Sequence, residues 1–104
     1  MIYLVDSKKL FRAINLLLKK YGLPSQKAKK ISNNLVEADL CGQSSHGVAR
    51  IPLYIGKVEK SEINIKAKSK IYNQTDTTAQ VDGDWGFGQL AADDAIKLCI
   101  KKAL

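Results

Sequence analysis

The chain has 104 residues, of which 45% are hydrophobic and 26% are charged, and its formal net charge is +7. This composition is typical of one small globular domain, and no apolar run approaches the roughly 18 residues that cross a bilayer. The first residues lack the basic segment of a secretory signal, so we expect a cytoplasmic protein.

The cysteine, histidine and lysine residues argue against disulfides, a metal site and a nucleic-acid site. Cys41 and Cys99 are too few for a disulfide framework and are expected to be free thiols. Together with His46 they match no common zinc spacing, so no metal site is expected. Lysines are spread from Lys8 to Lys102 in ones and twos, without interleaved aromatic residues. The positive charge therefore favours a solvated surface over a nucleic-acid site.

Two helices are predicted in the first 42 residues. Asp6 or Ser7 can cap the first helix, and Gly22 with the proline two residues later ends it. Ser25 can cap the second helix, and Gly42 is a plausible stop. The short turn between them predicts an antiparallel pair. The apolar positions are Leu10, Ile14, Leu17, Leu18 and Tyr21 in the first helix and Ala28, Ile31, Leu35 and Ala38 in the second.

A third helix is predicted between Gly47 and about Lys60, but its start is open because of Pro52. Proline is tolerated in the first turn of a helix and disrupts later turns. The helix therefore begins either near Gly47, with Pro52 just past its first turn, or near Ile51. In the second case His46 lies in the preceding loop. The apolar face is Val48, Ile51, Ile55 and Val58.

The residues after Ile63 predict a β-hairpin and a last helix, which makes the expected fold class α+β. The strands are expected at 70–74 and 77–81, with the turn at Thr75-Asp76. Thr77, Ala79 and Val81 would then share one face of the second strand. The helix from 88 to 104 has an apolar stripe so wide that it needs cover on more than one side. We therefore expect a chain cut short, or one that needs another domain or subunit.

The run from 45 to 54 carries the most chemical information. His46 is the only histidine, and Arg50 is one of only two arginines among 17 basic residues. An arginine can bind a carboxylate or phosphate with two parallel hydrogen bonds, and a histidine can move a proton near neutral pH. On a helix, His46, Arg50 and Tyr54 would line one face. Ser45 could relay a hydrogen bond to the histidine. Equally, His46 could be a surface residue, Ser45 a helix cap and Tyr54 a packing residue.

A glycine-rich run at 82–89 is the second candidate. It lies between a predicted strand and a predicted helix, where such loops often hold phosphates. Its order is G-x-x-G-x-G, which differs from the dinucleotide pattern, and no Walker lysine follows. A tight turn over a packed helix start is the favoured interpretation. Asp93 and Asp94 are adjacent, face different ways and are expected to support the last helix.

The string Ser-His-Gly-Val-x-Arg-x-Pro-x-Tyr at 45–54 resembles the malate/L-lactate dehydrogenase-like oxidoreductases, which are distinct from the Rossmann-type enzymes. The resemblance continues through the helix around 35–40, Asp82-Gly83 and the Gly-Phe-Gly-Gln run at 86–89 to the alanine-rich last helix. Two departures are Cys41, where an arginine is common, and Ser61, where a glycine is common.

The resemblance implies a role for each matching residue. His46 would be the acid/base, supported by Ser45 in a relay, while Arg50 would bind the substrate carboxylate with Tyr54 near the same pocket. The reaction would be hydride transfer between NAD or NADP and a 2-hydroxy acid, its 2-oxo acid or a related imino acid. The resemblance also implies a homodimer. Residues 1–104 would be the N-terminal, substrate-side portion of a longer enzyme, inactive alone. The cofactor-binding domain would be absent from this chain, so no cofactor-binding residue is assigned.

Two alternatives from other classes are a basic helical module that binds nucleic acid and a catalytically silent interaction domain. Salt-dependent binding to generic DNA would support the first.

Overall fold

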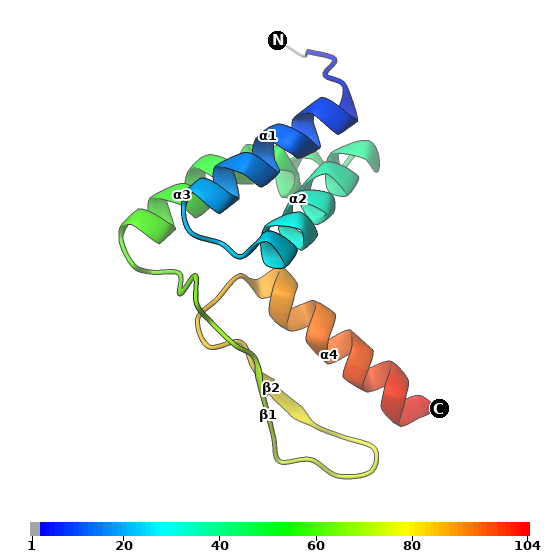
Figure 1. The fold of residues 1–104 in the computed structure, drawn as a ribbon. Helices are drawn as coiled ribbons and strands as arrows, with labels where there is room; N and C mark the ends of the chain where they lie inside the picture. The colour runs from blue at the N-terminus through cyan, green and yellow to red at the C-terminus, as the bar shows by residue number, and fades with distance from the viewer. Residues whose placement is uncertain (1–2) are drawn as a thin grey trace.

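A computed structural model describes residues 3–104. In this part of the chain, helices predominate and a single short β-hairpin separates the third helix from the fourth (Figure 1). The elements are α1 (Ser7–Lys20), α2 (Ser25–Leu40), the 3-10 turns η1 (Ser44–His46) and η2 (Val48–Arg50), α3 (Ile51–Glu59), β1 (Lys70–Tyr72), β2 (Gln80–Asp82) and α4 (Gly88–Ala103). The predicted α+β class is confirmed.

Helices α1 and α2 form the predicted antiparallel pair (Figure 1). Asp6 caps α1, because its Oδ1 accepts a hydrogen bond from the backbone N–H of Lys9 at 2.9 Å. Gly22 follows the helix with φ +102°, a conformation that suits glycine. The prediction that Ser25 caps α2 is wrong. Extended Pro24 holds the N-cap position, and Ser25 is the first helical residue.

The core lies where α1, α2 and the start of α3 meet. Its buried members are Ile14, Leu18, Leu23, Ala28, Ile31, Leu35, Ile51 and Phe87. Most of them come from the positions that the helical spacing predicts, while Phe87 reaches the core from the segment just before α4. Because Ile51 and Phe87 share this cluster, the first turns of α3 and α4 lie close together.

Helix α3 begins at Ile51, which resolves the two starts that the sequence leaves open. Pro52 then lies in the first turn, where its missing N–H costs no helical hydrogen bond. His46 accordingly precedes the helix and lies in η1.

The β-hairpin is present, but its strands are shorter than predicted. Lys70 pairs with Asp82 and Tyr72 with Gln80. The loop between the strands includes the predicted turn, where the Thr75 N–H donates to the Thr78 carbonyl at 2.9 Å. Of the residues expected to share one strand face, only Val81 lies in β2.

Helix α4 extends away from the three-helix part together with the hairpin (Figure 1). The radius of gyration is 15.2 Å, above the roughly 13 Å typical of a compact domain of about 100 residues. Ile96 on its predicted apolar stripe is more than half exposed, and so is Ile100 one turn further on. The stripe is therefore only partly covered by residues 3–104.

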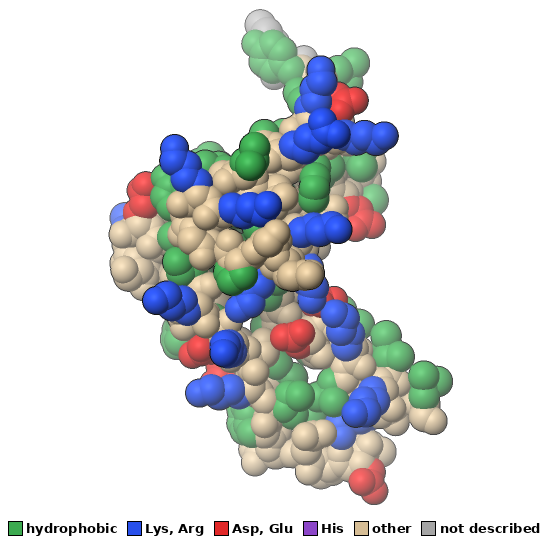
Figure 2. All heavy atoms as spheres, viewed as in Figure 1, with side chains coloured by type: hydrophobic (Ala, Val, Ile, Leu, Met, Phe, Trp, Pro, Cys, Tyr) green, Lys and Arg blue, Asp and Glu red, His purple; other side chains and the backbone are tan. Residues whose placement is uncertain are grey.

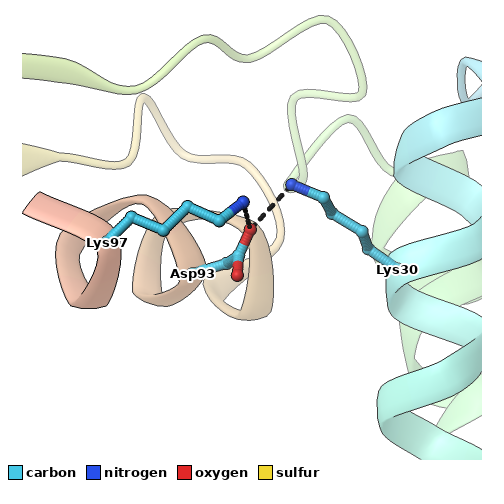
Figure 3. A network of polar contacts seen from close by, with 3 residues as sticks. All are labelled: Lys30, Asp93 and Lys97. Atoms are coloured by element: carbon cyan, nitrogen blue, oxygen red, sulfur yellow. Dashed lines mark hydrogen bonds and ion pairs between the residues drawn. The ribbon is translucent and has the colours of Figure 1, made fainter. Parts of the chain in front are cut away.

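An ion-pair cluster joins α4 to α2 (Figure 3). Lys30 of α2 and Lys97 of α4 each approach the same carboxylate oxygen of Asp93 at 2.7 Å. Hydrogen bonds from these two lysines lower the pKa of Asp93 below its ordinary value. Asp93 thus does more than support its own helix, because it also links that helix to α2.

Charged side chains are dispersed on the face seen in Figure 2, with lysines and arginines over all parts and acidic groups between them. Cys41 and Cys99 are exposed free thiols, as predicted. Among residues 3–104, no helix combines the length and apolar character needed to cross a membrane.

Candidate active site

The loop that carries the predicted site residues is held by Asp39, near the end of α2. Gly42 turns the chain with φ +80°, and η1 follows. The Asp39 carboxylate then accepts a hydrogen bond from the backbone N–H of Val48 at 2.9 Å. Gly47 is buried against the same carboxylate, and a Cβ there would collide with it. A side chain at position 47 would therefore displace the loop.

Four segments border one surface pocket next to this loop. The lining residues are Asn34, Ala38, Gln43, His46, Arg50, Tyr54, Gly88 and Gln89. They come from α2, from the loop with η1 and η2, from α3 and from the first turn of α4. Three of the predicted site residues, His46, Arg50 and Tyr54, thus share a pocket. Another hollow, between α1 and α2, contains none of them.

His46 and Ser45 form a hydrogen bond within η1. Ser45 Oγ and His46 Nδ1 are 2.9 Å apart, and either group can be the donor. When Nδ1–H donates to the serine, Nε2 carries a lone pair and can accept a proton. Once Nε2 is also protonated, it can return that proton. Ser45 does not line the pocket itself, so its contact with the site runs through the histidine.

Arg50 is oriented by the backbone of the same loop. Its Nε–H donates to the Ser45 carbonyl at 2.7 Å. Within residues 3–104, no hydrogen bond or ion pair engages its two terminal Nη groups. The Nη groups are therefore available for a two-point grip on a carboxylate in the pocket.

Tyr54 is held from two sides by residues next to the start of α4. Its ring packs edge-on against buried Phe87, with ring centroids 5.6 Å apart and planes at 81°. Gln89 Nε2 donates a hydrogen bond to Tyr54 Oη at 2.8 Å. No local sequence pattern gives Gln89 a site role, although it closes the Gly-Phe-Gly-Gln run that contributes to the family resemblance.

The glycine-rich run forms a tight turn, as favoured. Asp84 and Trp85 both have positive φ, of 55° and 57°, and Gly86 N–H donates to the Gly83 carbonyl at 3.0 Å. This is the pattern of a type I′ turn. A Cβ on Gly86 would collide with Ala67, so this glycine serves close packing. The turn follows an antiparallel hairpin strand, which is not the βαβ setting of a dinucleotide fingerprint.

The described residues, 3–104, contain no group of three or more histidine, cysteine or acidic side chains close enough to hold a metal ion.

We expect Gly47→Ala to lower the free energy of unfolding more than a substitution at a glycine that has open space around it. The new Cβ collides with Asp39 and displaces the carboxylate from the Val48 N–H, at a cost of about 1–3 kcal/mol in the free energy of unfolding. Gly56→Ala in α3 is the matched control, because a Cβ there meets nothing within 4 Å. Thermal melting of both variants measures the difference. Equal melting temperatures would contradict the assigned contact.

The chain matches a known protein family over most of its length. Residues 5–104 match the family described as malate/L-lactate dehydrogenase. The chain belongs to this family, and the resemblance carried by residues 45–54 is confirmed.

Individual relatives agree with this assignment. The chain is 44% identical over 87 residues to L-sulfolactate dehydrogenase of Methanocaldococcus jannaschii, covering 84% of this chain and 25% of that protein. It is 38% identical over 99 residues to malate dehydrogenase of Pyrococcus horikoshii, covering 95% of this chain and 28% of that protein. The solved structure of the latter superposes with a TM-score of 0.92 over the same shares of both chains. The chain thus spans about a quarter of the length of these relatives.

Proposed function

We propose that this chain is the N-terminal, substrate-side portion of an NAD(P)-dependent oxidoreductase that acts on a 2-hydroxy acid. The observation that carries the proposal is the convergence of His46, Arg50 and Tyr54 on one pocket. The family match and relatives named for malate and sulfolactate support it, because both compounds have a carboxylate beside the reacting carbon.

The charge of the pocket suits an anionic ligand. Arg50 is positive, and among the eight residues that line the pocket none is acidic. The first turn of α4, with Gly88 and Gln89, also borders the pocket, and no side chain caps this helix. The positive end of the helix dipole therefore adds to the attraction. Asn34 and Gln43 contribute further amide groups at the rim.

The proposed division of roles follows from the hydrogen bonds. Arg50, oriented through its Nε, binds the substrate carboxylate with its Nη groups. His46 Nε2 accepts the proton of the 2-hydroxyl group during oxidation and donates one to the 2-oxo oxygen during reduction. Ser45 Oγ accepts from Nδ1–H of the protonated ring and so stabilises the imidazolium. Tyr54 contacts the bound acid beside Arg50.

The nicotinamide cofactor supplies the acceptor or donor of the hydride. Within residues 3–104, the glycine-rich turn does not form a dinucleotide fingerprint, because Gly83 and Gly86 serve close packing and the turn follows an antiparallel hairpin. We therefore assign no residue of residues 1–104 to NAD or NADP and propose that a separate domain holds it. The homodimer and the cytoplasmic location stay predictions.

A substrate screen tests the proposal. The complete protein is assayed with L-malate, L-lactate and L-sulfolactate, each with NAD and with NADP, by the absorbance of the reduced nicotinamide. We expect oxidation of at least one acid, no oxidation of propan-2-ol, which lacks the carboxylate, and no turnover by residues 1–104 alone. A complete protein that oxidises none of these acids and reduces none of the corresponding 2-oxo acids would contradict the proposal.

A further inference from the structure

A hydrogen bond from Gln89 to Tyr54 joins the first turn of α4 to α3 at the edge of the pocket. Gln89 Nε2 donates to Tyr54 Oη at 2.8 Å, across 35 positions of the sequence. Both residues are partly buried, and both line the pocket that holds His46 and Arg50. The contact is thus part of the pocket wall.

The direction of this hydrogen bond determines what the tyrosine can offer to a ligand. A phenol has one O–H donor, and its oxygen can also accept. Because Tyr54 Oη accepts from Gln89, its own hydrogen is left to donate elsewhere. No other group among residues 3–104 forms a hydrogen bond with this oxygen. Tyr54 and Gln89 border two hollows, the pocket with His46 and Arg50 and a second one next to Trp85. The hydrogen is free to donate to a ligand in the first of them.

The position of the hydroxyl group is also constrained by packing. Phe87 is only 4% exposed and holds the Tyr54 ring in an edge-on contact. This contact restricts the movement of the Tyr54 ring as a whole. Phe87 and Gln89 lie on either side of Gly88 in the sequence. Phe87 packs against the Tyr54 ring, and Gln89 donates the hydrogen bond to its hydroxyl oxygen.

We propose that Gln89 is a positioning residue that makes Tyr54 a hydrogen-bond donor to the anionic group bound by Arg50. The inference rests on the proposed function, because it takes the ligand to be a carboxylate. Gln89 does not contact the reacting atoms. It acts through Tyr54, and it favours ligands that present an acceptor oxygen beside the Arg50 guanidinium.

The test is a double-mutant cycle in the complete protein, with steady-state kinetics on the best substrate among L-malate, L-lactate and L-sulfolactate. Tyr54→Phe is expected to raise KM about tenfold, the effect of losing one hydrogen bond to a charged group, with a much smaller change in kcat. Gln89→Met is expected to raise KM several-fold in the wild-type background and to have no further effect in Tyr54→Phe.

Two more variants separate this role from a purely structural one. Gln89→Glu keeps the shape of the side chain but accepts the phenol hydrogen, so KM should rise at least as much as in Gln89→Met. Gln80→Met is the matched control, because Gln80 lies in β2, outside the pocket. It should leave KM unchanged. Inhibition by oxalate, a non-reacting dicarboxylate, measures anion binding independently of turnover.

The outcomes distinguish this inference from the proposed function. If Gln89→Met raises KM equally with and without the Tyr54 hydroxyl, Gln89 does not act through Tyr54 and the inference is wrong. If Arg50→Lys weakens binding while both Gln89 variants behave like wild type, the proposed function stands and only the inference falls. If the wild-type protein neither oxidises nor binds any of these acids, both are wrong.

Discussion

Replacement of His46 by alanine is expected to lower kcat of the complete protein by about 10²–10⁴-fold, the usual contribution of a positioned acid/base. The side chain lines the pocket, and Ser45 engages its Nδ1, so Nε2 is the nitrogen that can exchange a proton with a ligand. Steady-state kinetics in both reaction directions measures the effect. KM should change much less than kcat, because the carboxylate grip belongs to Arg50.

Two serine variants show whether the effect belongs to the histidine itself. Ser45→Ala removes the partner of Nδ1 and should lower kcat, but less than His46→Ala does. Ser44→Ala is the matched control, because this exposed hydroxyl forms no hydrogen bond with residues 3–104. Wild-type kcat in His46→Ala would contradict the acid/base assignment and leave His46 as a surface residue.

The helices could be predicted from the sequence because their determinants are local. Apolar spacing located α1 and α2, and Gly22 with the following proline marked the break between them. The hairpin was harder. Its paired residues are few, and the loop between the strands is set by side-chain contacts such as the one from Asn73 to Gln80. Short strands whose residues are largely exposed leave little hydrophobic pattern to detect.

Three of the predicted site residues share a pocket, but the sequence left the backbone path that brings them there open. The i, i+4, i+8 spacing applies only to the first of the two predicted helix starts, in which one helix runs from His46 to Tyr54. In the structure the chain bends at Gly47, and the Asp39 carboxylate accepts a hydrogen bond from the Val48 N–H. Helix α3 begins only at Ile51. The same three side chains reach one pocket by way of two 3-10 turns.

The contacts of Asp39 and Gln89 could not be predicted from local sequence patterns, for the same physical reason. Each acts across a tertiary contact, nine positions for Asp39 to Val48 and 35 positions for Gln89 to Tyr54. Neither separation matches a helical or strand period, so only the packing of α2 and α4 against the loop and α3 reveals them. The roles of individual residues rest on their side-chain chemistry and on the family resemblance, and they stay predictions until the variants are measured.

Arg50→Lys is expected to raise KM for the 2-hydroxy acid about 10- to 100-fold, with a smaller effect on kcat. Lysine keeps the charge but offers a single ammonium in place of the planar fork. It also lacks an Nε–H for the Ser45 carbonyl, the contact that orients the side chain. Both losses weaken the grip on the carboxylate, whereas the proton transfer depends on His46.

The chain provides its own matched control, because Arg12 is the only other arginine and lies exposed in α1. Arg12→Lys should leave both KM and kcat at wild-type values. Oxalate inhibition should weaken in Arg50→Lys in parallel with KM, since both ligands use the same carboxylate contact. If Arg50→Lys instead lowers kcat with KM unchanged, Arg50 acts on the transition state rather than in substrate capture. If neither KM nor kcat moves, the guanidinium does not hold the substrate and the role proposed for Arg50 is wrong.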